Sequence, residues 1–199
     1  MKRKMLLLIL AAVPAALLPL AASSQIAPEK TVTSTEPTYK YELFAGWGYT
    51  SLNQVSQSTS GLQGFTLSGT RNFGKYFGVT VDGGHYAWDV TATNPVPATV
   101  DLLLAGPVLH APLYERLGIF VHGLLGTAHT GGDVVISPNY SFAGGIGVGL
   151  DYKLKSQHWG LRTYGDYIGS SFTLTPFQPG FSPHVRFNGR ASVGVTYKF

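Results

Sequence analysis

The sequence predicts an all-β protein in which eight antiparallel strands close into an up-and-down transmembrane β-barrel. From residue 39 onward, hydrophobic residues recur at every second position, which is the period of a strand with two different faces. Charged residues make up only 12 % of the 199 residues, and 25 residues are glycine. The mean hydropathy of +0.12 is too low for a bundle of membrane helices.

The first 24 residues predict a secretory signal peptide rather than part of the fold. Basic residues 2–4 precede an apolar run from Met5 to Leu20, and four small residues follow it. We expect cleavage at the bond after Ser24 or, equally acceptable, after Ser23. A single membrane anchor is the alternative, but the run is short and contains two prolines.

Loss of this segment changes the charge balance. Three of the 14 basic residues lie in it, so the mature chain carries 11 basic and 10 acidic residues and a net charge of +1. A basic surface for nucleic acid is therefore not expected. Residues 25–38 contain two prolines and many polar residues, and they predict an extended periplasmic lead-in to a barrel over residues 39–199.

Eight segments show strand character. The clearest is residues 140–154, where one face carries large apolar residues and the other carries small or charged ones. Residues 100–110 and 117–129 are apolar on both faces, so their facing is left open. The expected strands are residues 39–49, 62–73, 77–88, 100–110, 117–129, 140–154, 159–172 and 185–199.

The connections between these segments differ in expected length. Residues 74–76, 111–116 and 155–158 are short, whereas residues 50–61, 89–99, 130–139 and 173–184 are longer and rich in turn-forming residues. Short turns at one end and longer loops at the other are typical of outer-membrane barrels. With an even number of strands, both termini are expected on the short-turn, periplasmic side.

A soluble β-sandwich or a lipocalin-like binder would also show alternation, so other features must decide. The polar faces are mostly Gly, Ser, Thr and Ala, which suits a narrow interior filled by side chains. Aromatic residues gather near the expected strand ends, where they would form two interfacial girdles. The periplasmic girdle would comprise Tyr41, Phe73, Tyr152, Trp159, Tyr197 and Phe199, and the outer girdle Trp47, Tyr49, Tyr140, Tyr167 and Phe187.

The C-terminal residues 192–199, SVGVTYKF, contain a polar residue at Ser192, then Gly194, Tyr197 and Phe199. This pattern resembles the C-terminal assembly signal of bacterial outer-membrane barrels. With the stretches GFTLSGTRNFGKYFGVTVDGG, FAGGIGVGLDYKL and LRTYGDY, residues 39–199 resemble the small OmpA-like eight-stranded outer-membrane barrels. The resemblance implies residence in the bacterial outer membrane and insertion by its barrel assembly machinery.

Charged residues on the expected inward faces predict an ion-pair network in the lumen. An unpaired charge in a narrow interior is costly, so acidic and basic side chains should pair there. A gated polar path or a small-ligand site is the less favoured alternative. The expected members are Glu42, Asp82, Asp101, Asp151, Lys153, Arg162, Asp166 and Arg190.

Other candidate sites are weaker. The run Gly145-x-Gly147-x-Gly149 lacks the spacing of a dinucleotide fingerprint and predicts only space for neighbouring side chains. The chain has no cysteine and its six histidines show no zinc spacing, so no metal or other cofactor is expected. His122 or His129 could serve a hydrolytic triad, but no serine lies in a nucleophile elbow.

These observations predict a non-enzymatic outer-membrane protein with a structural or surface-interaction role. Eight strands leave room for side chains but not for a broad channel. The expected molecule is a monomer in outer-membrane lipid with four extracellular loops, whose ligand the sequence does not identify. An outer-membrane lipid-modifying enzyme and a small-solute pore of low conductance are the alternatives.

Overall fold

A computed structural model gives the structure of residues 39–53, 59–89, 98–132, 140–170 and 186–199. The expected signal peptide, the lead-in and the whole of the expected loop over residues 173–184 lie outside this part of the chain. Eight strands form a closed barrel, which confirms the predicted fold class. The strands are β1 (Tyr41–Asn53), β2 (Thr59–Asn72), β3 (Phe77–Asp89), β4 (Ala98–Pro112), β5 (Leu117–Gly132), β6 (Tyr140–Lys153), β7 (Trp159–Ser170) and β8 (Arg186–Lys198).

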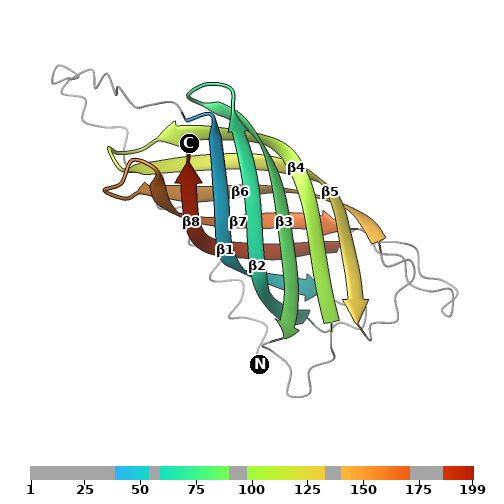
Figure 1. Ribbon diagram of the computed structural model, residues 1–199. Helices are drawn as coiled ribbons and strands as arrows, with labels where there is room; N and C mark the ends of the chain where they lie inside the picture. Colours follow the sequence, from blue (N-terminus) through green and yellow to red (C-terminus); the bar gives the residue numbers. More distant parts are fainter. Residues whose placement is uncertain (1–38, 54–58, 90–97, 133–139, 171–185) are drawn as a thin grey trace, which may run out of the picture. The chain divides into compact units, whose positions relative to one another are not determined.

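Each strand pairs antiparallel with the next along the chain, and β8 returns to pair with β1 (Figure 1). Two backbone hydrogen bonds close this seam at its end: Tyr41 N–H donates to Phe199 O at 3.0 Å, and Phe199 N–H donates to Tyr41 O at 2.9 Å. We call the end of the barrel that holds Tyr41, Phe199 and the connections 73–76, 113–116 and 154–158 the terminal end. The opposite end is the distal end. Within the described residues, no helix is long and apolar enough to cross a membrane.

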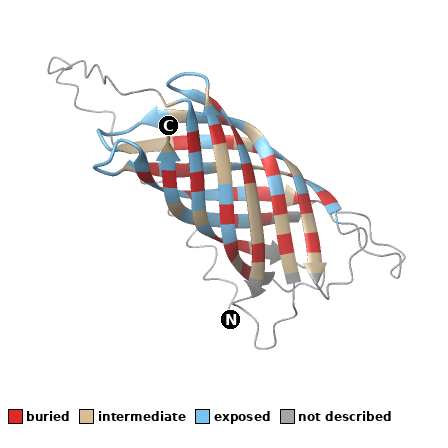
Figure 2. Cartoon of the chain, viewed as in Figure 1, coloured by how far each residue is buried: buried red, intermediate tan, exposed pale blue. Residues whose placement is uncertain are grey.

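Buried and exposed residues alternate along the strands, as the bands in Figure 2 show. In β7 every second residue from Gly160 is buried, and the residues between are exposed or nearly so. The exposed positions carry large apolar side chains around the whole barrel, among them Leu67, Val81, Leu125 and Val193. A continuous apolar outer wall is a surface for lipid and is not found on a soluble sandwich or lipocalin. The soluble alternative is therefore excluded.

The facing of β4 and β5, which the sequence leaves open, is now defined. In both strands the even-numbered residues point inward, including Leu102 and Leu104 of β4 and Phe120 and Leu124 of β5. Pairing between the strands runs from Ala98↔Gly132 to Ala105↔Leu125 and resumes at Val108↔His122. Pro107 lies in the interval, where its ring nitrogen has no hydrogen to donate to the ladder.

Strand pairing extends further at the distal end than the sequence predicts. The connection expected over residues 50–61 is reduced to residues 54–58, because β1 continues to Asn53 and β2 begins at Thr59. Strand likewise replaces both ends of the connection expected at 89–99 and the start of the one expected at 130–139, whereas β7 ends at Ser170 and β8 begins at Arg186, so the strands around the expected 173–184 connection are shorter than predicted. One consequence is that Trp47 lies in the middle of β1 rather than in a girdle at its end. The expected girdle of the terminal end is exposed at all six positions.

Candidate functional site

The interior of the barrel is filled by three layers of side chains. The layer nearest the terminal end, here called the terminal cluster, is centred on Arg162 of β7. Its guanidinium donates from Nε to Asp151 Oδ1 at 2.6 Å, and from Nη2 to Asp151 Oδ2 and Glu42 Oε2, both at 2.7 Å. Lys198 Nζ lies 3.6 Å from Glu42 Oε1, and Asn72 Nδ2 donates to the same oxygen at 2.9 Å. Side chains from five strands meet in this cluster.

The second layer, the central cluster, is built around Arg190 of β8. Its side chain is 0 % exposed and pairs with Asp82 of β3 and Asp166 of β7. The Tyr164 hydroxyl donates to Asp82 Oδ2 at 3.0 Å, and His122 Nε2 lies 2.7 Å from Asp166 Oδ1. Each carboxylate thus has at least two partners, as buried charges require.

Aromatic rings join the two charged layers. The Arg162 guanidinium carbon lies 4.7 Å from the centre of the Phe120 ring, and that of Arg190 lies 5.3 Å from the centre of Tyr164. Phe44 and Phe120 contact Tyr164 edge to face, with ring centres 5.5 and 6.2 Å apart. The flat faces of these rings therefore cover the cations and exclude water from the ion pairs.

Glycine makes room for the central cluster. A Cβ atom at Gly147 would collide with Asp166 Oδ1 and His122 Nε2, and one at Gly149 would collide with the Phe120 ring. The sequence predicts this role for the glycine run of β6, whose inward positions leave space for side chains from β5 and β7.

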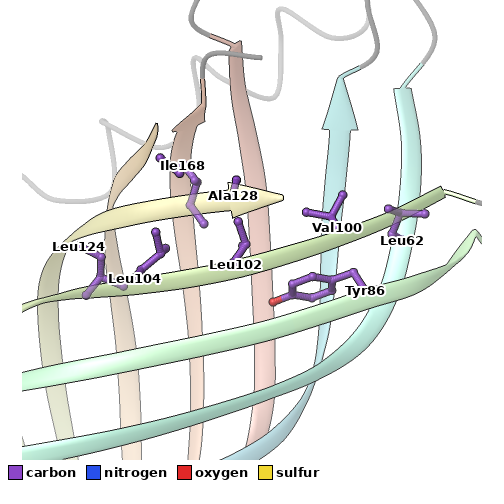
Figure 3. Close-up of a cluster of buried hydrophobic side chains, with 9 residues drawn as sticks. Leu62, Tyr86, Val100, Leu102, Leu104, Leu124, Ala128 and Ile168 are labelled. Carbon is purple, nitrogen blue, oxygen red and sulfur yellow. The ribbon is translucent and has the colours of Figure 1, made fainter. Parts of the chain in front are cut away.

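The third layer, the distal apolar cluster, contains no charged side chain. Figure 3 shows the labelled side chains of this cluster on the inner wall. Leu104 and Leu124 lie near the middle of β4 and β5, and the other members lie nearer the distal ends of their strands. The largest members, Leu62, Tyr86 and Leu104, are at most 1 % exposed. The cluster comprises Leu62, Tyr86, Val100, Leu102, Leu104, Leu124, Ala128, Ala143 and Ile168.

The structure brings six of the eight expected network residues together: Glu42, Asp151 and Arg162 in the terminal cluster, and Asp82, Asp166 and Arg190 in the central cluster. Lys153 lies on the inward-facing side of β6, two positions beyond Asp151. Asp101 does not face the lumen, so its assignment to the network was wrong. Its side chain is 44 % exposed on the outer wall, where it contacts His85 and His129.

The reason for this error is the apolar character of β4 on both faces. The distal lumen accepts Val100, Leu102 and Leu104, and the odd-numbered Asp101 must then point outward. Four contributing residues were missed: Asn72, His122, Tyr164 and Lys198. Lys198 lies on the same face of β8 as Arg190, so the alternation of that strand could have identified it. His122 could not be identified in this way, because the sequence leaves open which face of β5 points inward.

The four residues of the C-terminal motif occupy both walls of β8. Ser192 and Gly194 face inward, and Gly194 lies against the backbone of Ala45 and Gly46. Tyr197 and Phe199 face outward, and the Phe199 ring centre is 5.6 Å from that of Tyr41 across the seam.

Solved structures of other proteins have the same fold as this chain. No protein-family model matches the chain, and no curated protein sequence does. The crystal structure of Neisserial surface protein A is similar, with a TM-score of 0.64 and 14 % identity over 80 % of this chain and 97 % of that one. The attachment invasion locus protein Ail of Yersinia pestis is also similar, with a TM-score of 0.54 and 15 % identity over 81 % of this chain and 99 % of that one. At these identities the likeness shows the fold, and the chain has the fold of the small eight-stranded outer-membrane β-barrels.

Proposed function

We propose that this protein is a closed barrel of the bacterial outer membrane with a structural and surface-interaction role, not a porin and not an enzyme. The observation that supports this most strongly is the filling of the lumen. The terminal and central clusters occupy one half with buried ion pairs, and the distal apolar cluster, together with uncharged polar side chains such as Thr130 and Asn188, occupies the other. A small ion that entered from the distal end would have to leave water among leucine and tyrosine side chains, which is costly.

Conductance across a planar lipid bilayer tests this proposal. The refolded wild-type barrel should give no stable current steps under conditions where a general porin inserted in the same bilayer gives them. Steady steps from the wild-type protein would instead support the low-conductance pore. The observation in favour of that second candidate is a set of buried hydroxyls, those of Thr66, Ser192 and Thr196, whose oxygens have no hydrogen-bond partner within the described residues. Water molecules at these hydroxyls would make the lumen more polar than the direct contacts indicate.

We further propose that the terminal end faces the periplasm and the distal end faces the exterior. The absence of cysteine from the sequence makes this easy to test with single substitutions. An Asn94→Cys variant should react with a membrane-impermeant maleimide on intact cells. A Ser156→Cys variant, in the connection between β6 and β7, should react only after the outer membrane is permeabilised. The opposite labelling pattern would refute the proposed orientation.

A surface role fits this orientation, because the four distal connections would then be the part of the barrel that meets the surroundings. The names of the two similar barrels describe a surface protein and an attachment invasion protein. We propose contact with an external partner for this chain also, as a monomer in lipid. Deletion of the gene should therefore alter binding of cells to surfaces or ligands without altering the lipid composition of the outer membrane, whereas altered lipid composition would favour the enzyme.

The terminal Phe199 is proposed to act in recognition by the barrel assembly machinery. Its removal should leave unassembled protein in the periplasm, detected as loss of the band that shifts on heating in an electrophoresis gel. Phe73→Ala is the matched control, because Phe73 is another exposed aromatic residue at the terminal end. Equal assembly of the Phe199 deletion and wild type would count against this role.

A further inference from the structure

An acid and two histidines form a cluster on the lipid-facing wall. Asp101 of β4 lies between His85 of β3 and His129 of β5. His85 Nδ1 is 2.6 Å from Asp101 Oδ1, and His129 Nδ1 is 3.2 Å from Asp101 Oδ2. The side chains of His85 and His129 are 41 % and 32 % exposed.

The height of the cluster places it at a membrane boundary. A tilted strand crosses the hydrocarbon in about 9–11 residues. Asp101 lies eleven positions from Pro112, the terminal end of β4, and His129 lies twelve positions from Leu117, the terminal end of β5. Polar headgroups therefore lie at the level of Asp101 and His129 if the exposed aromatic girdle of the terminal end marks the other boundary. His85 lies eight positions from Phe77, the terminal end of β3, which places it on the hydrocarbon side of the same boundary.

Neighbouring residues support this position. Register pairing places Phe65 beside His85, Asp101 between the two histidines, and Tyr140 beside His129 on the outward face. The Phe65 ring packs on His85 at 5.5 Å and the Tyr140 ring on His129 at 4.4 Å. Aromatic rings on both sides of a polar cluster are typical of the membrane–water interface.

The hydrogen bonds fix which nitrogen of each ring is available. A carboxylate can only accept, so both Nδ1 atoms carry their hydrogen toward Asp101, and Nε2 of each ring is left for another partner. With both rings neutral the cluster carries one negative charge, and with both protonated it carries one positive charge. The other titratable side chain that faces the cluster from the described neighbouring residues is Tyr140.

A hollow of about 530 Å³ lies on the same outer wall, toward the middle of the barrel. Its lining is apolar apart from His122 and includes Pro107, Leu109, Val121, Gly123, Ile146 and Gly165. Gly123 lies six positions from His129 along β5, a separation of about 20 Å at the rise of a β-strand. A lipid whose headgroup lies at the cluster can therefore extend a hydrocarbon chain down β5 into the hollow.

We propose that His85, Asp101 and His129 bind the phosphate group of a membrane lipid when both histidines are protonated, and that an acyl chain of the same lipid fills the hollow at Gly123. The two protonated Nε2 atoms donate to the phosphate oxygens. Asp101 is a positioning residue, since it holds both rings through Nδ1 and makes no contact with the lipid.

Native mass spectrometry of the detergent-solubilised full barrel tests the proposal, with dioleoylphosphatidylglycerol as the probe because its charge is constant between pH 5.5 and 7.5. Wild type should bind this lipid about tenfold more tightly at pH 5.5, the effect expected of one charge-assisted hydrogen bond. The double variant His85→Gln/His129→Gln should lose that difference. His158→Gln, an exposed histidine at the terminal end, should keep it.

Three further arms distinguish the parts of the site. Dioleoylglycerol, which has the same chains and no phosphate, should show no dependence on pH. Inorganic phosphate should compete only weakly, and competition as strong as that of the lipid would overturn the lipid assignment in favour of a simple anion site. Gly123→Leu should weaken lipid binding at both pH values, since a Cβ there meets no atom within 4 Å and the side chain fills the hollow without displacing a neighbour. Equal binding by wild type and the double histidine variant would refute the proposal.

Discussion

The lumen is filled differently toward its two ends: buried ion pairs dominate in the terminal half, whereas the distal half combines the distal apolar cluster with uncharged polar side chains such as Thr130 and Asn188. In the terminal and central clusters, four carboxylates meet Arg162, Arg190, Lys198 and His122, and each contact requires a particular pair of strands. In the distal apolar cluster, burial alone holds the side chains, and one apolar residue can replace another of similar size. The comparison indicates that the charged half fixes which strands face each other across the barrel, while the apolar half supplies closure. Buried polar groups are known to specify register in other folds.

The largest expected effect comes from removing the most buried cation. Arg190→Met leaves Asp82 and Asp166 without their shared partner, and an uncompensated buried charge costs about 3–5 kcal/mol. Urea unfolding of the refolded barrel in detergent should show this loss in the free energy of unfolding. Arg71→Ala is the control, because Arg71 is exposed at the terminal end.

A rescue variant sharpens this test of the charged half. Arg190→Met/Asp82→Asn/Asp166→Asn removes the charges together, so it should recover much of the stability lost in Arg190→Met. If the single and triple variants are equally unstable, shape rather than charge holds the central cluster. That result would remove the distinction between the two halves.

The second-largest effect is expected from truncating an inward leucine of the distal apolar cluster, compared with truncating a leucine of the outer wall. Leu104 is 1 % exposed in the distal apolar cluster, whereas its neighbour Leu103 is 60 % exposed toward lipid. Leu104→Ala should lower the free energy of unfolding by about 3 kcal/mol through the cavity it leaves. Leu103→Ala should cost much less, because lipid chains fill the space. Equal losses in the same unfolding assay would contradict the assignment of β4 facing.

β4 also shows where reasoning from the sequence fails. The alternation in β6 and β8 is clean, and their inward and outward faces could be predicted from residue type alone. In β4 both faces are apolar, so its facing is open from the sequence, and Asp101 was grouped with the charged residues expected on the inward faces. The partners that make its outward position favourable, His85 and His129, lie on other strands. Their proximity depends on the register between strands, which the sequence of one strand does not contain.

The third effect concerns the space beside the central cluster. Gly147→Ala puts a methyl group into Asp166 and His122, and a forced shift of this kind costs about 2 kcal/mol. Gly83→Ala, at an outward position of β3, is the matched control because the nearest atoms to its Cβ lie 3.9 Å away. Thermal unfolding should give a lower midpoint temperature for Gly147→Ala than for Gly83→Ala. If Gly147→Ala unfolds at the same temperature as wild type, the His122–Asp166 contact can shift without a measurable loss of stability.

The smallest effect isolates one hydrogen bond of the charged half. Tyr164→Phe removes the hydroxyl that donates to Asp82 Oδ2 at 3.0 Å but keeps the ring that covers Arg190. A hydrogen bond to a charged group contributes about 1.5 kcal/mol, so the variant should unfold at a slightly lower urea concentration. Tyr152→Phe, an outward tyrosine at the terminal end, should unfold as wild type does. Because Asp82 also pairs with Arg190, the cost of combining Tyr164→Phe with Arg190→Met should differ from the sum of the two changes, whereas strict additivity would mean that the layer does not act as one network.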